Sequence, residues 1–191
     1  MKKLLLLAAF ALCANPALAQ NNTANTNQNG SGLSSDIDQS GQFNDAVVNQ
    51  DGTNATSDIF QSGDGTNVDR QNEVEVTQTG DGAFSFVSQS GSNRNEAEVI
   101  QDGDQDSFID QDGRVQSAEV RQSGGIGNFS DIDQAGNSNS GGNPLNGSAA
   151  GVIQEGDNNS SMIDQDAASF VGANVTQLGA DNSSAIQQEV F

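Results

Sequence analysis

The side chains that could do chemistry in this chain are carboxylates, hydroxyls and amides. The 191-residue sequence has 26 Asp and Glu, no His and a single Cys, Cys13. General-base and nucleophilic catalysis usually needs a His, Lys or Cys beside the reacting group, and the many Ser residues have no evident activator. Asp131 and Asp133 are the residue types of a glycosidase pair, but similar pairs recur along the chain, as a solvated acidic surface would. We therefore expect no catalytic residues.

Three carboxylates have part of the spacing of a calcium loop. Asp102, Asp104 and Asp106 occupy alternate positions around an expected turn. A calcium loop also needs a Gly and a closing Glu, and Ser107 and Gly113 stand in those two places. We expect neither a metal site nor a cofactor.

The amides show the strongest pattern, because Gln recurs about every eleven residues. An amide both donates and accepts hydrogen bonds, so a stack of identical Gln side chains satisfies itself, as in cross-β assemblies. We expect such a self-assembly ladder from Gln39, Gln50, Gln61, Gln78, Gln89, Gln101, Gln111, Gln122, Gln134, Gln154, Gln165, Gln177 and Gln188.

The residues before each Gln predict the element that positions it. A Val or Ile stands two places before every one of these Gln, and a small residue stands four places before, alternately Ser and Ala with Val74 as the exception. These positions share the parity of a β-strand and point to one face, while the intervening positions are rich in Asp and Glu. Six units extend the inward row with an Asn six places before the Gln, and we assign these to the ladder as well: Asn44, Asn72, Asn95, Asn128, Asn159 and Asn182.

A Gly two places after the Gln predicts a turn after each strand. It is present in eleven of the twelve units that another unit follows, and Gly tolerates the positive φ of tight reversals. An eleven-residue period also fits a helix, but each Gly would cost about 1 kcal/mol there. The polar composition alone is typical of disorder, which the repeat argues against.

The alternation of Ser and Ala indicates that the true repeat is about 22 residues long. We predict an all-β fold, a β-solenoid or cross-β stack of strand-turn-strand repeats with two facing parallel sheets and about six and a half turns. Fully burying a Val or Ile contributes at most ~1.5–3 kcal/mol, against ~1–2 kcal/mol of entropy per ordered residue. A lone monomer should therefore be marginally stable.

The chain divides into three expected segments. Residues 1–19 have the positive start, apolar run and Ala-x-Ala end of a signal peptide, and Leu12 disfavours lipidation at Cys13. Residues 20–32 are an Asn-rich segment expected to be flexible, and 33–191 are the repeat domain. Two longer spacings place insertions near 64–71 and 139–147, which we expect to be loops on one edge.

The charge restricts the partners. Lys2 and Lys3 lie in the expected signal segment, so its removal takes the net charge from −20 to −22. Phosphate neutralisation needs Lys and Arg, so we expect no nucleic acid partner and no membrane insertion.

The unit that begins at Ser35 resembles a known repeat. It reads S-x3-Q-x-G-x2-N-x-A-x3-Q through Gln39, Gly41, Asn44, Ala46 and Gln50. This is similar to the curlin repeat of bacterial curli, which are extracellular amyloid fibres, and the resemblance runs from about residue 33 to residue 188. The chain departs from curlins in its two insertions, in its lack of Tyr, and in Gln105 and Gln116, which replace the motif Asn.

The resemblance implies a secreted structural subunit that polymerises with itself at the bacterial cell surface, for adhesion and biofilm matrix. It also implies three partners: a curli-type outer-membrane secretion pore, a periplasmic chaperone and a surface nucleator. Residues 20–32 resemble the segment that directs curlins to the pore.

Two functions follow from the residues. The first is the fibre subunit, with an uncapped last strand that ends at Gln188 and templates another copy. Because stacked like charges oppose assembly, we expect such fibres to grow faster at low pH or high salt. The second is a soluble monomeric β-solenoid that acts as a surface adhesin or as a cation- or ice-binding module, which predicts capped ends and a regular ligand row.

Overall fold

The computed structural model describes residues 21–64, 72–137, 148–167 and 172–190. The expected signal segment 1–19 and nearly all of the insertions 64–71 and 139–147 lie outside these ranges. Within them the chain forms fourteen strands and no helix long and apolar enough to cross a membrane. The strands are β1 Thr23–Ser31, β2 Ser34–Gln42, β3 Asn44–Thr53, β4 Thr56–Asp64, β5 Asn72–Asp81, β6 Phe84–Asn93, β7 Glu96–Asp102, β8 Gln105–Arg114, β9 Gln116–Ser123, β10 Asn128–Asn137, β11 Ser148–Glu155, β12 Ser160–Ala167, β13 Gly172–Leu178 and β14 Ser183–Val190.

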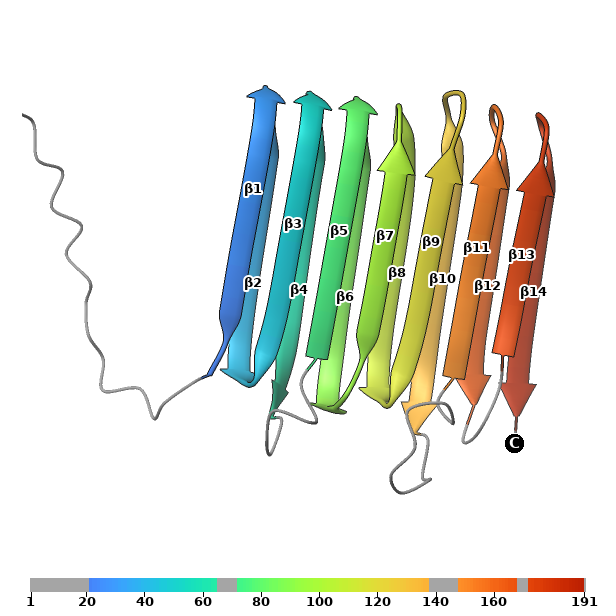
Figure 1. Ribbon diagram of the computed structural model, residues 1–191. Coiled ribbons are helices and arrows are strands. Elements are labelled where there is room, and N and C mark those ends of the chain that lie inside the picture. Colours follow the sequence, from blue (N-terminus) through green and yellow to red (C-terminus); the bar gives the residue numbers. More distant parts are fainter. Residues whose placement is uncertain (1–20, 65–71, 138–147, 168–171, 191) are drawn as a thin grey trace, which may run out of the picture.

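The strands alternate between two facing sheets, which confirms the predicted parallel β-solenoid. The odd sheet has the order β1-β3-β5-β7-β9-β11-β13, the even sheet has the order β2-β4-β6-β8-β10-β12-β14, and all the pairings are parallel. Figure 1 shows the two layers advancing together from β1 and β2 to β13 and β14.

The register places identical positions of successive repeats beside each other. In the even sheet, for example, Ser107, Ile109 and Gln111 pair with Ser130, Ile132 and Gln134. The Ser units all lie in the even sheet and the Ala units in the odd sheet, so the 22-residue repeat is confirmed. The Val and Ile rows of both sheets meet in one core, where Ile59, Val76 and Ile109 are completely buried.

Glycine bends the backbone near the end of most strands. Gly113, two places after Gln111, has a φ of +153°, and a Cβ there would lie 1.8 Å from the carbonyl oxygen of Gly136 in the next layer. Most of these Gly residues lie within the strand rather than after it, and all strands except β7 and β13 have eight to ten residues. The reversal follows at left-handed residues such as Asn54 and Val115, with φ of 55° and 57°.

The structure has one strand more than the sequence predicted. Segment 20–32 was expected to be flexible and to precede the first strand, but Thr23–Ser31 forms β1 and pairs with β3 over its whole length. The stack therefore has seven turns instead of six and a half. The missed signal is Ala24, Thr26, Gln28 and Gly30, which repeat the unit spacing with Thr in place of Val or Ile.

Each of the two expected insertions lies between an even strand and the odd strand that follows it. One follows β4 and precedes β5, and the other follows β10 and precedes β11. Because all even strands run parallel, β4 and β10 end on the same side of the stack, and both insertions follow from that side.

Candidate functional site: the glutamine and asparagine ladders

The predicted Gln side chains form one continuous ladder in each sheet. Along the odd ladder, the Nε2 of each Gln donates to the Oε1 of the next at 2.7–3.0 Å. The even ladder has the same bonds at 2.8–3.0 Å. The odd ladder holds Gln28, Gln50, Gln78, Gln101, Gln122, Gln154 and Gln177, and the even ladder holds Gln39, Gln61, Gln89, Gln111, Gln134, Gln165 and Gln188. Sequence reasoning missed Gln28, which lies in β1.

The same amides also join the two sheets. Gln111 donates from Nε2 to the carbonyl oxygen of Glu96 in the odd sheet at 3.1 Å. In return, Gln122 of the odd sheet donates to the carbonyl oxygen of Asp106 at 3.0 Å. Gln111 and Gln122 are at most 1% exposed, and each Nε2 uses one proton along the ladder and one across the core. Such a buried, fully bonded network fixes both the register and the distance between the sheets.

The ladders have a direction. Every Gln before the last layer donates toward the following layer, so the bonds point from β1 and β2 toward β13 and β14. At the first layer, the Oε1 atoms of Gln28 and Gln39 accept no bond from the described residues. At the last layer, Gln188 donates to the carbonyl oxygen of Gly172 at 3.3 Å, and Gln177 donates to that of Ser160 at 2.9 Å and to the Oγ of Ser184 at 3.5 Å. Neither has a following Gln among the described residues. One end of the stack therefore presents acceptors and the other presents donors.

The six predicted Asn residues lie in two rows, one on each sheet. Asn44, Asn72 and Asn95 begin odd strands, and Asn128, Asn159 and Asn182 begin even strands. In both rows a side-chain Oδ1 accepts a hydrogen bond from the backbone N–H of the next layer. The Oδ1 of Asn72 accepts from the N–H of Asn95 at 3.2 Å, and the Oδ1 of Asn128 accepts from the N–H of Asn159 at 2.9 Å.

The two Gln residues that replace the motif Asn bond less completely. Gln116 donates to the carbonyl oxygen of Gln134 at 2.9 Å, but its Oε1 has no partner among the described residues. Gln105 is 1% exposed, and neither of its amide atoms has a described partner. The longer side chain does not reproduce the Asn bond to the next layer.

The small residues four places before the Gln form an unusual column in the even sheet. The Oγ atoms of five Ser residues are buried without a described hydrogen-bond partner: Ser57, Ser85, Ser107, Ser130 and Ser161. The Ala column of the odd sheet faces the same core and carries no polar atom. Small size, and not hydrogen bonding, is therefore what these positions provide.

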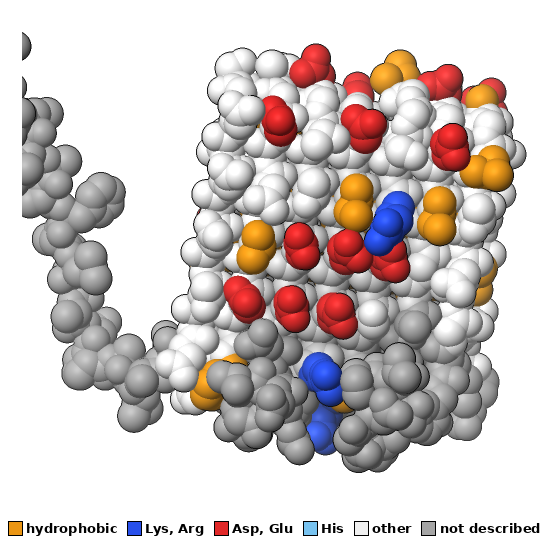
Figure 2. All heavy atoms as spheres, viewed as in Figure 1, with side chains coloured by type: hydrophobic (Ala, Val, Ile, Leu, Met, Phe, Trp, Pro, Cys, Tyr) orange, Lys and Arg blue, Asp and Glu red, His pale blue; other side chains and the backbone are white. Residues whose placement is uncertain are grey.

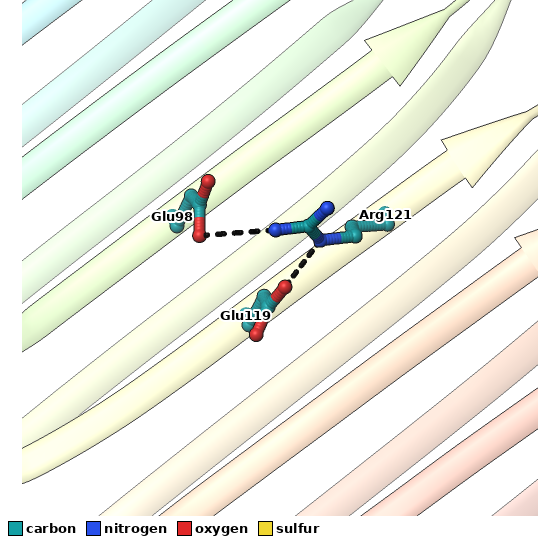
Figure 3. A network of polar contacts seen from close by, with 3 residues as sticks. All are labelled: Glu98, Glu119 and Arg121. Atoms are coloured by element: carbon teal, nitrogen blue, oxygen red, sulfur yellow. Dashed lines mark hydrogen bonds and ion pairs between the residues drawn. The ribbon is translucent and has the colours of Figure 1, made fainter.

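The outer faces carry acidic rows, as the parity predicts. On the odd sheet, Glu73 pairs in register with Glu96 and Glu75 with Glu98, and Figure 2 shows carboxylates gathered over the middle strands of this face. Arg121 on β9 donates to Glu119 and lies 3.7 Å from Glu98 on β7, which partly neutralises one row (Figure 3).

Four of the crowded carboxylates have a raised pKa. Partial burial, and then the charges of Glu96, Asp45 and Glu75, raise the pKa of Glu73. On the even sheet, partial burial followed by the charges of Asp110 and Asp164 raises the pKa of both Asp131 and Asp133. Burial and the nearby Asp104 also raise the pKa of Asp106.

The outer face of the even sheet also carries a diagonal cluster of aromatic rings that the sequence analysis did not single out. Phe60 on β4, Phe86 on β6 and Phe108 on β8 follow one another with centroid distances of 5.6 and 6.3 Å, and only Phe86 and Phe108 pair in register. Phe129 on β10 lies 5.6 Å from Phe108 but pairs in register with Asp106. The strand parity alone places these rings outside, and they interrupt the acidic rows.

The described part of the chain contains no cluster of catalytic or metal-binding side chains. A shallow hollow of about 200 Å³ over β1, β3 and β5 is lined by amides and hydroxyls and by one carboxylate, Asp51. Asp102, Asp104 and Asp106 do not form a cluster of metal ligands, and no other group of three does within the described ranges.

One comparison with known proteins found a match. The family model of the curlin associated repeat matches residues 71–103. This segment is therefore similar to the curlin repeat. It contains β5, β6 and β7, with Asn72 and Asn95 of the odd Asn row and with Gln78, Gln89 and Gln101 of the two ladders. Neither the curated proteins nor the solved structures gave a match.

The strands on both sides of the matched segment continue its geometry. β3 pairs with β5 from Asn44 and Asn72 through Gln50 and Gln78 to the Gly that follows. β7 pairs with β9 in the same register. The matched segment is therefore one part of a longer stack that keeps the same register.

Proposed function

We propose that this chain is a secreted structural subunit that polymerises end to end into extracellular curli-like amyloid fibres, which serve adhesion and the biofilm matrix. The observation that carries the proposal is the directed pair of Gln ladders, which present Oε1 acceptors at the first layer and Nε2 donors at the last. A second copy in the same register satisfies both ends. Its backbone also pairs with the outer edges of β13 and β14, which no described strand covers.

The curlin repeat supports the further parts of the proposal. By this resemblance the expected signal peptide directs export, a curli-type outer-membrane pore and a periplasmic chaperone handle the unfolded chain, and a surface nucleator starts the fibre. The high negative charge of the chain keeps the subunits soluble until they meet such a template.

Seeded assembly of purified residues 20–191 tests the proposal. We expect a lag that preformed seeds abolish, and fibres whose diffraction shows a ~4.8 Å repeat along the fibre axis. Ile186→Asp, on the inward row of β14, should slow seeded growth strongly, whereas Gln187→Asn on the outward row should leave it nearly unchanged. A chain that stays monomeric at high concentration with seeds present contradicts the proposal and supports a soluble β-solenoid.

A further inference from the structure

We infer that β1, formed by segment 20–32, is the docking strand for the next subunit, with β13 of one copy pairing to β1 of the following copy. This inference rests on the proposed fibre function and names the surfaces that meet. The segment thus acts in assembly in addition to any role in export.

The first step is geometric. Each layer of the stack consists of one odd and one even strand, and fourteen strands complete seven layers. If the chain began at β2, the first layer would lack its odd strand. Pairing β14 to β2 of the next copy would then leave a gap one strand wide in the odd sheet. β1 fills that place, so both sheets continue across the junction.

The second step is the register. β1 pairs with β3 with Ala24 beside Ala46 and Gln28 beside Gln50. The same rule across the junction puts Ala173 beside Ala24 and Gln177 beside Gln28 of the next copy. The Nε2 of Gln177 then reaches the Oε1 of Gln28, the acceptor that has no donor among the described residues.

The third step is charge. Inside the stack, like charges repeatedly face each other in register, and cross-strand pairs of this kind are destabilising. These pairs are Asp36/Asp58, Asp45/Glu73, Glu73/Glu96, Glu75/Glu98, Glu98/Glu119, Asp110/Asp133, Asp133/Asp164 and Asp166/Glu189.

The proposed junction contains no such pair. The outward residues of β1 and β13 are all uncharged, among them Asn25, Asn27, Asn174 and Thr176, and in Figure 2 β1 carries no acidic side chain. Between β14 and β2, Gln187 meets Asp38 and Ala185 meets Asp36. Covalent linkage holds layers together within the chain despite repulsion, but two separate copies have no such tether. An intermolecular junction therefore requires end strands that do not bring like charges opposite each other.

A double-mutant cycle tests the contact. Asn25 and Asn174 lie in the first and last strands of the odd sheet, so within one copy they are too far apart to interact. Across the junction they are direct partners. In residues 20–191, Asn25→Asp with Asn174→Asp should slow elongation from seeds of the same variant by up to about fivefold more than the two single changes predict. Asn25→Asp with Asn174→Lys should restore the rate, and high salt should reduce both effects.

Deletion provides a second measurement. A chain that begins at residue 33 should elongate wild-type seeds much more slowly than residues 20–191, and the amides of Thr23–Ser31 should be protected from hydrogen exchange in wild-type fibres. Additive rates in the cycle, together with wild-type elongation after the deletion, contradict this inference while leaving the fibre function intact. Absence of fibres from the unsubstituted chain contradicts the proposed function, and the inference with it.

Discussion

At the scale of single residues, the buried Gln amide is the group on which the stack depends. Each amide bonds along its ladder and also across to the backbone of the other sheet, as Gln111 does toward Gln134 and Glu96. The repeat therefore specifies a particular side-chain length as well as a polar group. An Asn at the same position would be one methylene too short to make both bonds.

Replacing an interior Gln should be costly. Gln111→Ala leaves the Oε1 of Gln134 without its donor and the Nε2 of Gln89 without its acceptor, and opens a cavity in the core. We expect a loss of roughly 2–4 kcal/mol in the free energy of unfolding, measured by chemical denaturation followed by circular dichroism. Gln187→Ala, exposed on β14, is the control and should cost less than about 0.5 kcal/mol. Equal losses for the two variants would contradict the role of the ladder.

The buried Ser column should behave in the opposite way. Ser107 is completely buried, and its Oγ has no partner among the described residues. Burying an unbonded hydroxyl costs about 1–3 kcal/mol, so Ser107→Ala should leave the stack equally stable or stabilise it by about 1 kcal/mol. Ser107→Val adds volume to a packed core and should destabilise it. A clear destabilisation by Ser107→Ala in the same denaturation assay would show that the hydroxyl makes a bond.

At the scale of strands, the period in the sequence determined most of the fold. Parity and Gly spacing predicted the inward rows, and the Ser/Ala alternation predicted which strands share a sheet. β1 was not predicted as a strand because Thr26 replaces the usual Val or Ile within an Asn-rich segment, although Ala24, Gln28 and Gly30 keep the spacing. The bonds between the sheets could not be predicted, because they depend on the distance between two layers that no sequence spacing reports.

The Asn rows follow the same alternation. Three of the Asn residues stand in units with Ala or Val74 and three in units with Ser, so the alternation assigns them to different sheets. In the structure this position belongs to the odd sheet for Asn44, Asn72 and Asn95 and to the even sheet from Asn128 onward. The change of sheet occurs where Gln105 and Gln116 stand, and both of these amides are incompletely bonded.

One Gly should be indispensable to its strand. In Gly113→Ala the new Cβ would meet the carbonyl oxygen of Gly136 at 1.8 Å, backbone that cannot move without disturbing the layer. We expect a loss of about 3 kcal/mol or more, or failure to fold. Gly124→Ala is the matched control, because its Cβ would meet nothing closer than 3.8 Å and only the positive φ of 65° is strained, which should cost about 1 kcal/mol. Similar unfolding curves for the two variants would contradict the close approach of the layers.

At the scale of the whole molecule, the stack combines directed ladders with like-charge rows. The hydrogen bonds of the Gln ladders repeat from the first layer to the last, while the acidic residues of the odd sheet are confined to the strands between the uncharged β1 and β13. Attraction therefore favours continuation at the ends, and repulsion is largely internal to each subunit.

The acidic rows make the stability depend on pH. The raised pKa of Glu73, Asp106, Asp131 and Asp133 means that the folded stack binds protons more tightly than the unfolded chain. The resulting stabilisation is fully present below the ordinary values, 3.8 for Asp and 4.5 for Glu, and is lost as the pH rises through the higher values in the stack. We expect denaturation midpoints to rise on acidification from neutral pH to about 4.

A variant isolates this effect. Asp133→Asn removes one charge that faces Asp110 and Asp164, so it should stabilise the stack at neutral pH and flatten the pH dependence. Ser40→Asn, on the outward row of β2, is the control and should leave the pH profile unchanged. A midpoint that is independent of pH, or one that falls on acidification, would show that these carboxylates do not oppose folding.

The length of fibre that each subunit occupies tests the central claim most directly. Seven layers at a spacing of ~4.8 Å give one chain for about 34 Å of fibre if solenoids stack end to end. Mass-per-length measurement by scanning transmission electron microscopy on single, unbundled fibres of residues 20–191 should give this value. One chain per ~4.8 Å would mean that each copy lies flat as a single layer of an in-register amyloid, and would contradict the account.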